Sequence, residues 1–81
     1  MREIFEEYIN TLLSQISNEF TDLNAGIIHR EIGGYPGKNH RMPKCCEVMY
    51  SMMKGTDIVL SAPPKGKGAS LTIRYFKVNH K

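Results

Sequence analysis

The sequence predicts a small α+β domain in which three helices precede a β-hairpin. A wide apolar stripe recurs at helical spacing over residues 2–18. A glycine-rich turn at residues 33–39 separates two further helical segments, 25–32 and 43–54. Two strand-like segments then flank a short loop of proline, glycine and lysine at 63–69, a pattern typical of an antiparallel hairpin with a polar tip.

The bulk composition predicts one domain, residues 1–81. Cys45 and Cys46 are adjacent; because a bridge between neighbours would be badly strained, we expect two buried thiols in a reducing compartment. Glu3, Glu6 and Glu7 interrupt any apolar run of the kind that opens a signal peptide. No apolar run approaches the ~20 residues that span a bilayer. These observations favour a cytoplasmic protein with no membrane partner.

The first predicted helix, residues 2–18, has the clearest pattern. Its acidic residues cluster in the first turns, where the helix dipole favours negative charge. We expect the apolar stripe to be core; its width also allows a homodimer through helix 2–18. The stripe consists of Ile4, Phe5, Tyr8, Ile9, Leu12, Leu13 and Ile16.

Residues 20–24 break the helical pattern and are expected to join the first helix to the second. Asp22 or Asn24 is suited to cap the second helix, residues 25–32. Gly33 and Gly34 end it, since glycine adopts left-handed conformations at little cost. We expect Ile27, Ile28 and Ile32 to face the core, and His29, Arg30 and Glu31 to be mostly exposed.

The third predicted helix, residues 43–54, is capped by Asn39 or Met42, has Pro43 in its first turn and stops at Gly55. It has two faces. Cys45, Cys46, Met49, Met52 and Met53 form the predicted core face, and Arg41, Lys44, Glu47 or Val48, and Ser51 form the candidate recognition face.

Residues 56–62 and 70–78 alternate in the manner of strands, with the hairpin tip between them. The last residues, 79–81, are expected to fray.

Charge is divided unevenly along the chain. Residues 1–24 carry one Lys or Arg and five acids, a net charge of −4, whereas residues 25–81 carry ten Lys or Arg and three acids, a net charge of +7. A basic segment that includes a turn, a helix start and a hairpin tip predicts a polyanionic partner. The candidate nucleic-acid-binding residues are Lys38, His40, Arg41, Lys44, Ser51, Lys65 and Lys67.

The order of elements resembles the winged helix-turn-helix superfamily over nearly the whole chain. Residues 2–18, 25–32 and 43–54 correspond to its three helices and residues 57–77 to its wing. The turn and helix start at 34–43 also resemble a motif of small prokaryotic proteins. The resemblance implies binding of double-stranded DNA by a transcriptional regulator or a DNA-targeting module, with helix 43–54 in the major groove and the tip 63–69 on the backbone. Two departures, the long turn before the third helix and the proline at 43, favour backbone contacts over base reading.

The resemblance also implies a role for each basic residue. Arg41 and Lys44 would lie near base edges, where arginine can pair with guanine. Lys38, Lys65 and Lys67 would contact phosphates, which set affinity and salt dependence without reading sequence. His40 would pack on sugar or add a hydrogen bond.

Other functions find less support in the sequence. Residues 33–38 lack the spacing of an NTPase phosphate loop and follow a helix instead of a strand. The His and Cys residues lack zinc-site spacing. A Cys45/His40 pair has no evident orienting acid, so we expect no catalytic residues, no metal and no cofactor. Two alternatives stay open: a protein-interaction module that docks an acidic partner, and RNA binding.

Overall fold

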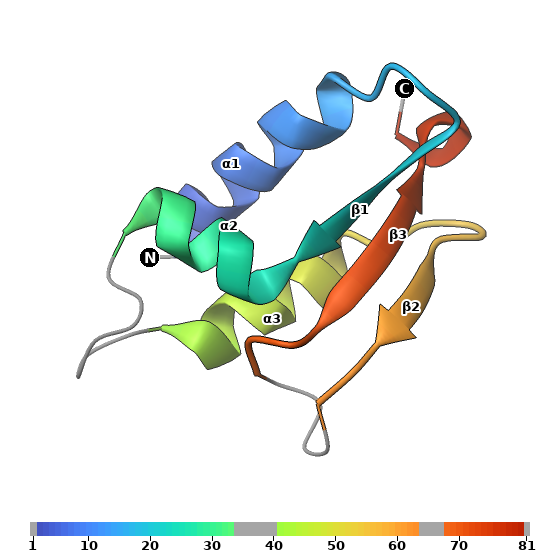
Figure 1. The fold of residues 1–81 in the computed structure, drawn as a ribbon. Helices are drawn as coiled ribbons and strands as arrows, with labels where there is room; N and C mark the ends of the chain where they lie inside the picture. Colours follow the sequence, from blue (N-terminus) through green and yellow to red (C-terminus); the bar gives the residue numbers. More distant parts are fainter. Residues whose placement is uncertain (1, 34–40, 64–67, 81) are drawn as a thin grey trace.

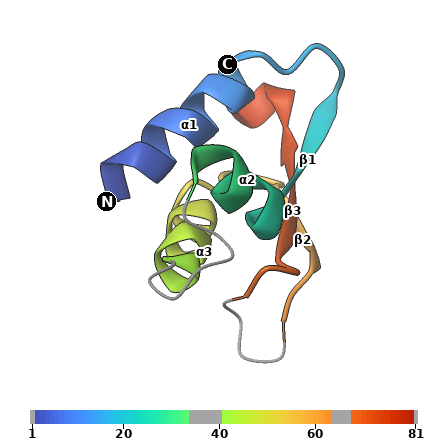
Figure 2. The same ribbon diagram turned by 60° about the vertical axis from the view of Figure 1, so that its left-hand side comes forward.

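The computed structural model describes residues 2–33, 41–63 and 68–80. Within that part, three α-helices and a three-stranded antiparallel sheet form an α+β fold, with the strands in the order β1-β3-β2 (Figure 1). Figure 2 views the sheet nearly edge-on, with all three helices on one side of it. The elements are α1 (Arg2–Ser14), β1 (Phe20–Asn24), α2 (Ala25–Ile32), α3 (Met42–Ser51), β2 (Ile58–Ser61), β3 (Thr72–Phe76) and a 3₁₀ turn, η1 (Lys77–Asn79).

Helix α1 confirms the apolar stripe but ends at Ser14, four residues earlier than predicted. Phe5, Ile9 and Leu13 are buried at the centre of the core, and Ile4 at the edge of the stripe is half exposed. Ile16 is also buried although it follows the helix. Residues 15–19 instead connect the helix to the sheet, where β1 forms hydrogen bonds with β3. A longer helix would not leave enough chain for this pairing.

The segment 20–24, predicted to be a connection, is the strand β1. All five of its residues pair with β3, from Phe20 opposite Phe76 to Asn24 opposite Thr72. Asp22 and Asn24 are poor strand formers, so local propensity hides the strand. The pairing is stabilised across the strands, because Arg74 donates two hydrogen bonds to the carboxylate of Asp22, at 2.8 and 3.1 Å.

Helix α2 has the predicted bounds and the predicted cap. The side-chain oxygen of Asn24 accepts from the backbone N–H of Ile27 at 3.1 Å, and the helix ends at Gly33, whose φ is 111°. Two side-chain placements were wrong, however. Ile27 is 59% exposed and His29 only 3%, because α1 and the start of α3 cover the side of α2 that carries His29.

Helix α3 spans Met42–Ser51, so it begins one residue before the predicted range 43–54 and ends three residues before its end. Arg41 is its N-cap residue and Met42 its first residue, while Pro43 lies in the first turn as predicted. Cys45, Cys46 and Met49 are fully buried, which confirms the core face. Val48, placed with the recognition face as an alternative to Glu47, is fully buried as well.

Strands β2 and β3 form the predicted hairpin, each shorter than its predicted range. A bulge between Val59 and Ser61 shifts their register. The inward face of β3 buries Ile73 and Tyr75 against the helices. On the outward face, Phe20 and Phe76 meet edge to face and the Arg74 guanidinium lies 3.9 Å from the Phe20 ring centre.

The end of the chain is anchored, contrary to the predicted fraying of residues 79–80. Asn79 donates to the carbonyl of Lys54 at 2.8 Å and to the carboxylate of Asp57 at 2.7 Å. His80 pairs with the same buried carboxylate. These bonds tie the residues after β3 to the turn between α3 and β2.

That turn contains a glycine that the sequence placed at the end of the third helix. Gly55 has a φ of 53°, and a Cβ there would lie 2.5 Å from the side-chain oxygen of Asn79. We expect Gly55→Ala to lower the free energy of unfolding by about 1–2 kcal/mol, since it adds left-handed strain and displaces Asn79. Urea denaturation measures this. In an Asn79→Ala background the same change should cost less; an equal cost in both backgrounds would show that the contact with Asn79 contributes nothing.

Candidate nucleic-acid interface

The start of α3 presents the basic residues that the sequence selected and the structure describes. Arg41 is exposed at the N-cap position, and its backbone N–H donates to the imidazole of His29 at 2.8 Å. Lys44, one turn later, is 43% exposed at its side chain. Both cations therefore stand at the same end of one helix, whose position is fixed through a buried side chain of α2.

Lys44 is not an isolated charge. Its ammonium lies 3.4 Å from the carboxylate of Glu47, one turn along the helix, and both side chains are about 40% exposed. Exposed pairs of this kind contribute little to stability. A phosphate group close to Lys44 would compete with Glu47 for it, and Glu47 would repel that phosphate.

The base of the hairpin lies beside the first half of α3. The thiol of Cys46 donates to the carbonyl of Gly68 at 3.4 Å, and the N–H of Gly26 donates to the carbonyl of Ala69 at 3.1 Å. Gly68 and Ala69, which precede β3, therefore lie close to α2 and α3. Four of the predicted site residues, Lys38, His40, Lys65 and Lys67, lie outside the described residues.

Ser51 does not share the location of Arg41. It lies at the other end of α3, about 15 Å away at 1.5 Å per residue. Its hydroxyl donates to the carbonyl of Val48 at 2.7 Å and accepts from Arg2 at 3.0 Å. The structure therefore adds Arg2, the single basic residue of the acidic first segment, to this end of α3. The sequence carries no signal for that contact, which joins residues 49 positions apart.

Burial of the two thiols argues against cysteine chemistry. Cys45 and Cys46 are both fully buried, and the Cys45 thiol points to the carbonyl of Ala25 at 3.8 Å. Burial, with a smaller contribution from Cys46, raises the pKa of Cys45 to about 12. A nucleophilic cysteine needs the opposite shift.

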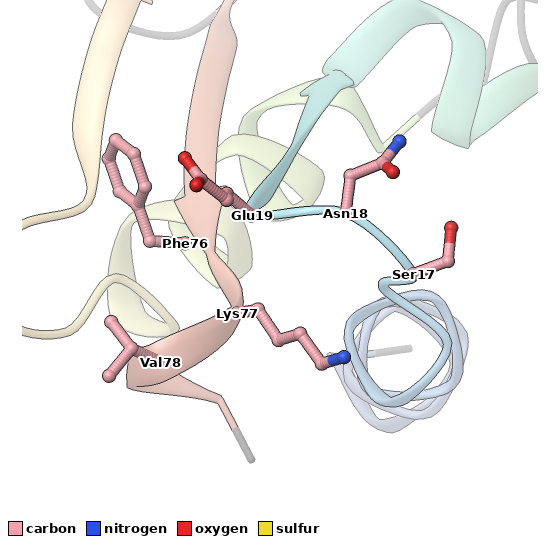
Figure 3. Close-up of a pocket in the computed structure, with 6 residues that line it drawn as sticks. All are labelled: Ser17, Asn18, Glu19, Phe76, Lys77 and Val78. Atoms are coloured by element: carbon pink, nitrogen blue, oxygen red, sulfur yellow. The ribbon is translucent and has the colours of Figure 1, made fainter.

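A hollow lies at the end of the sheet where β1 begins and β3 ends. It measures about 660 Å³ and is open to solvent. Two of its lining residues are joined by a backbone bond, in which the N–H of Lys77 donates to the carbonyl of Glu19 at 2.8 Å. Figure 3 shows the Lys77 side chain directed toward the end of α1, away from Phe76 and Val78. The polar side chains that line this hollow do not converge on a common point, so the hollow does not resemble a catalytic pocket. The lining residues are Ser17, Asn18, Glu19, Phe76, Lys77 and Val78.

Neither a metal-binding cluster nor a membrane-spanning helix occurs among residues 2–33, 41–63 and 68–80. In that part of the chain, no group of three or more His, Cys, Asp or Glu side chains is arranged to hold a metal ion. None of the helices there is both long and apolar enough to cross a bilayer.

Comparison of the chain with protein-family models, with curated proteins and with solved structures found no match. The interpretation of the basic surface therefore rests on its own geometry and charge.

Proposed function

We propose that this chain is a winged helix-turn-helix protein that binds double-stranded DNA without catalysis, as a transcriptional regulator or a DNA-targeting module. In this proposal α3 enters the major groove from its N-terminal end, and the hairpin tip contacts the neighbouring backbone. The observation that carries it is the placement of Arg41 and Lys44 at the exposed start of α3, beside the base of the β2–β3 hairpin.

The shape of this surface suits a duplex. Helix α3 presents its exposed side with Pro43, Lys44 and Glu47, while its other side is sealed into the core by Cys45 and Cys46. A helix of this width fits the major groove. A rigid helix whose first turn carries two cations would contact the phosphates that flank the groove and place arginine near base edges.

The ion pair between Lys44 and Glu47 on α3 would also affect DNA binding. Lys44 can exchange Glu47 for a phosphate at small cost, since the pair is exposed. The negative charge of Glu47 then repels the phosphate and lowers the affinity for DNA. Neutralising it in Glu47→Gln should tighten DNA binding, whereas Lys44→Ala should weaken it.

Little of the apolar stripe on α1 is left exposed for the predicted homodimer through helix 2–18. Phe5, Ile9 and Leu13 are buried in the protomer's own core, so the contact would be formed by the half-exposed Ile4, the partly buried Tyr8 and Leu12, and the acidic side chains beside them. Such a seam would carry like charges on both sides. The dimer stays a prediction, tested by the concentration dependence of the molecular mass in sedimentation.

A salt titration of binding to random duplex DNA tests the proposed function. By fluorescence anisotropy between about 50 and 300 mM salt, log K should fall linearly against log [salt] with a slope of about −3 to −6. Arg41→Ala should reduce any preference between sequences by about 1–3 kcal/mol at the affected base. Lys65→Ala with Lys67→Ala should weaken all duplexes alike and flatten the slope by about two.

The controls separate the rival functions. Lys54→Ala removes an exposed cation that lies beyond the C-terminal end of α3, so it should change the slope little. No binding at about 50 mM salt would overturn the proposal and favour an acidic protein partner, to be sought by pull-down. A preference for structured RNA over the DNA duplex would favour RNA recognition.

A further inference from the structure

One buried side chain connects the two residues that border the segment 34–40. The imidazole of His29 is 3% exposed; its Nδ1 lies 3.1 Å from the carbonyl oxygen of Gly33, and its Nε2 lies 2.8 Å from the backbone nitrogen of Arg41. On a third side the ring of Phe5 meets it edge to face, with centroids 5.2 Å apart. His29 thus holds the end of α2 and the start of α3 together.

The partners of the ring fix its protonation state. A backbone N–H can only donate, so the Nε2 atom that faces Arg41 must accept and carry no proton. A carbonyl can only accept, so the Nδ1 atom that faces Gly33 must carry the proton. His29 is therefore a neutral Nδ1–H tautomer in this arrangement. Adding a proton to Nε2 would place two donors against each other and break the bond to Arg41.

We infer that His29 is a positioning residue for the proposed DNA-binding surface: its neutral ring holds Arg41 and the first turn of α3 in the binding arrangement, and protonation of the ring releases them. The inference rests on the proposed function for its consequence, and on the two hydrogen bonds for its geometry. It predicts a dependence on pH with an unusual sign. Protonating a histidine ordinarily strengthens binding to a polyanion, whereas protonating this one should weaken it.

Several charged groups lie on the elements around the ring. On α1, Arg2 lies about one turn before Phe5 and pairs at 3.1 Å with Glu6, which directly follows Phe5. On α2, Arg30 and Glu31 follow His29 and are exposed. On α3, the Arg41 side chain is exposed, Lys44 pairs with Glu47, and the Cys45 thiol stays neutral because burial raises its pKa. A proton on Nε2 would face the backbone N–H of Arg41, so the bond that holds the start of α3 would be lost.

Two substitutions separate the two bonds. The side-chain amide of asparagine reaches as far as Nδ1, so His29→Asn keeps a donor for Gly33 and removes the acceptor for Arg41. The longer glutamine reaches the position of Nε2, so His29→Gln keeps an acceptor for Arg41 and cannot be protonated. At neutral pH we expect His29→Asn to weaken DNA binding about tenfold, the effect of losing one such hydrogen bond, and His29→Gln to weaken it less. Thermal unfolding of both variants provides the matched control for stability.

The pH profile distinguishes positioning from a merely structural role. Between pH 8 and 5 the wild type should lose affinity at the pH where NMR shows His29 gaining its proton, and His29→Gln should keep or gain affinity over the same range. His40 and His80 are present in both proteins, so any contribution from them cancels in the ratio. Identical profiles for the two proteins would overturn the inference.

A second measurement needs no DNA. A nitrogen–nitrogen coupling across the hydrogen bond from the Arg41 amide to His29 Nε2 should be observed by NMR at neutral pH and vanish when the ring is protonated. If the wild type binds no DNA yet shows this coupling, the proposed function fails and the positioning geometry stands. If the coupling is absent in a protein that binds DNA, the inference fails and the proposed function stands.

Discussion

Replacing Asp57 by alanine is expected to lower the free energy of unfolding by about 3 kcal/mol. A chain of 81 residues has a total stability of about 4–12 kcal/mol, so the loss is a large part of the whole. The carboxylate has no exposed side-chain surface, and four donors converge on it. They belong to the backbone of Lys54 and Phe76 and to the side chains of Asn79 and His80.

The size of the effect follows from what the alanine would leave behind. Removing one partner of a buried polar cluster leaves the others desolvated without a hydrogen bond, which costs more than the bond contributes when it is made. Here the unsatisfied groups would include the backbone N–H of Phe76 at the end of β3 and that of Lys54 in the turn after α3. The turn after α3 and the end of the chain would both lose their anchor.

The same carboxylate makes stability depend on pH. Burial disfavours the charge on Asp57, but the N–H of Phe76, the ring of His80, the amide of Asn79 and the N–H of Lys54 outweigh burial and hold its pKa below the ordinary value. A group whose pKa is lower in the folded state stabilises the fold above its unfolded pKa, about 3.9. Stability should therefore decline as the pH falls from about 5 through the folded pKa.

Urea denaturation of wild type, Asp57→Ala and Asp22→Asn between pH 7 and 3 measures both effects. Asp22 is a matched control, because its pKa is also lowered, chiefly by the hydrogen bonds from Arg74, yet its side chain is exposed. Asp22→Asn should cost far less at neutral pH. A loss for Asp57→Ala no larger than that for Asp22→Asn would contradict the buried cluster.

The contrast between these two carboxylates illustrates what the sequence can predict. Helix α2, its Asn24 cap and its Gly33 end were predicted correctly, since each depends on residues within one turn of chain. Strand β1 was missed, because its stability comes from pairing with β3, about 50 residues away in the sequence. The anchored end at Asn79 and His80 was missed for the same reason: its partner is Asp57, which no local pattern identifies.

The candidate site divides in the same way. The exposure of Arg41 and Lys44 was predictable from the period of one helix. The burial of His29 was not predictable, since Arg30 and Glu31 directly follow it and are exposed, so the local sequence gives no signal of burial. Only the approach of α1 and α3 to the same side of α2 encloses the ring. A residue's chemistry is readable from sequence, and its surroundings are set by contacts between distant elements.

Phe5→Ala is expected to cost about 3–5 kcal/mol of unfolding free energy, the range for truncating a buried aromatic side chain. Phe5 is fully buried and packs edge to face on His29, so alanine would leave a cavity between α1 and α2. At the lower end of the expected total stability, a loss at the upper end of this range would leave most of the chains unfolded at 25 °C. Circular dichroism against urea concentration measures the change.

Ile4→Ala provides the control for this position. Ile4 precedes Phe5 on the same helix but is 49% exposed, so its truncation should cost well under half as much. Phe5→Leu keeps most of the buried volume and removes the aromatic contact with His29, so it should leave the protein folded. If the stripe of α1 served mainly as a seam between protomers, the order would reverse. Ile4→Ala would then shift the dissociation of a dimer, and Phe5→Ala would leave the monomer's stability nearly unchanged.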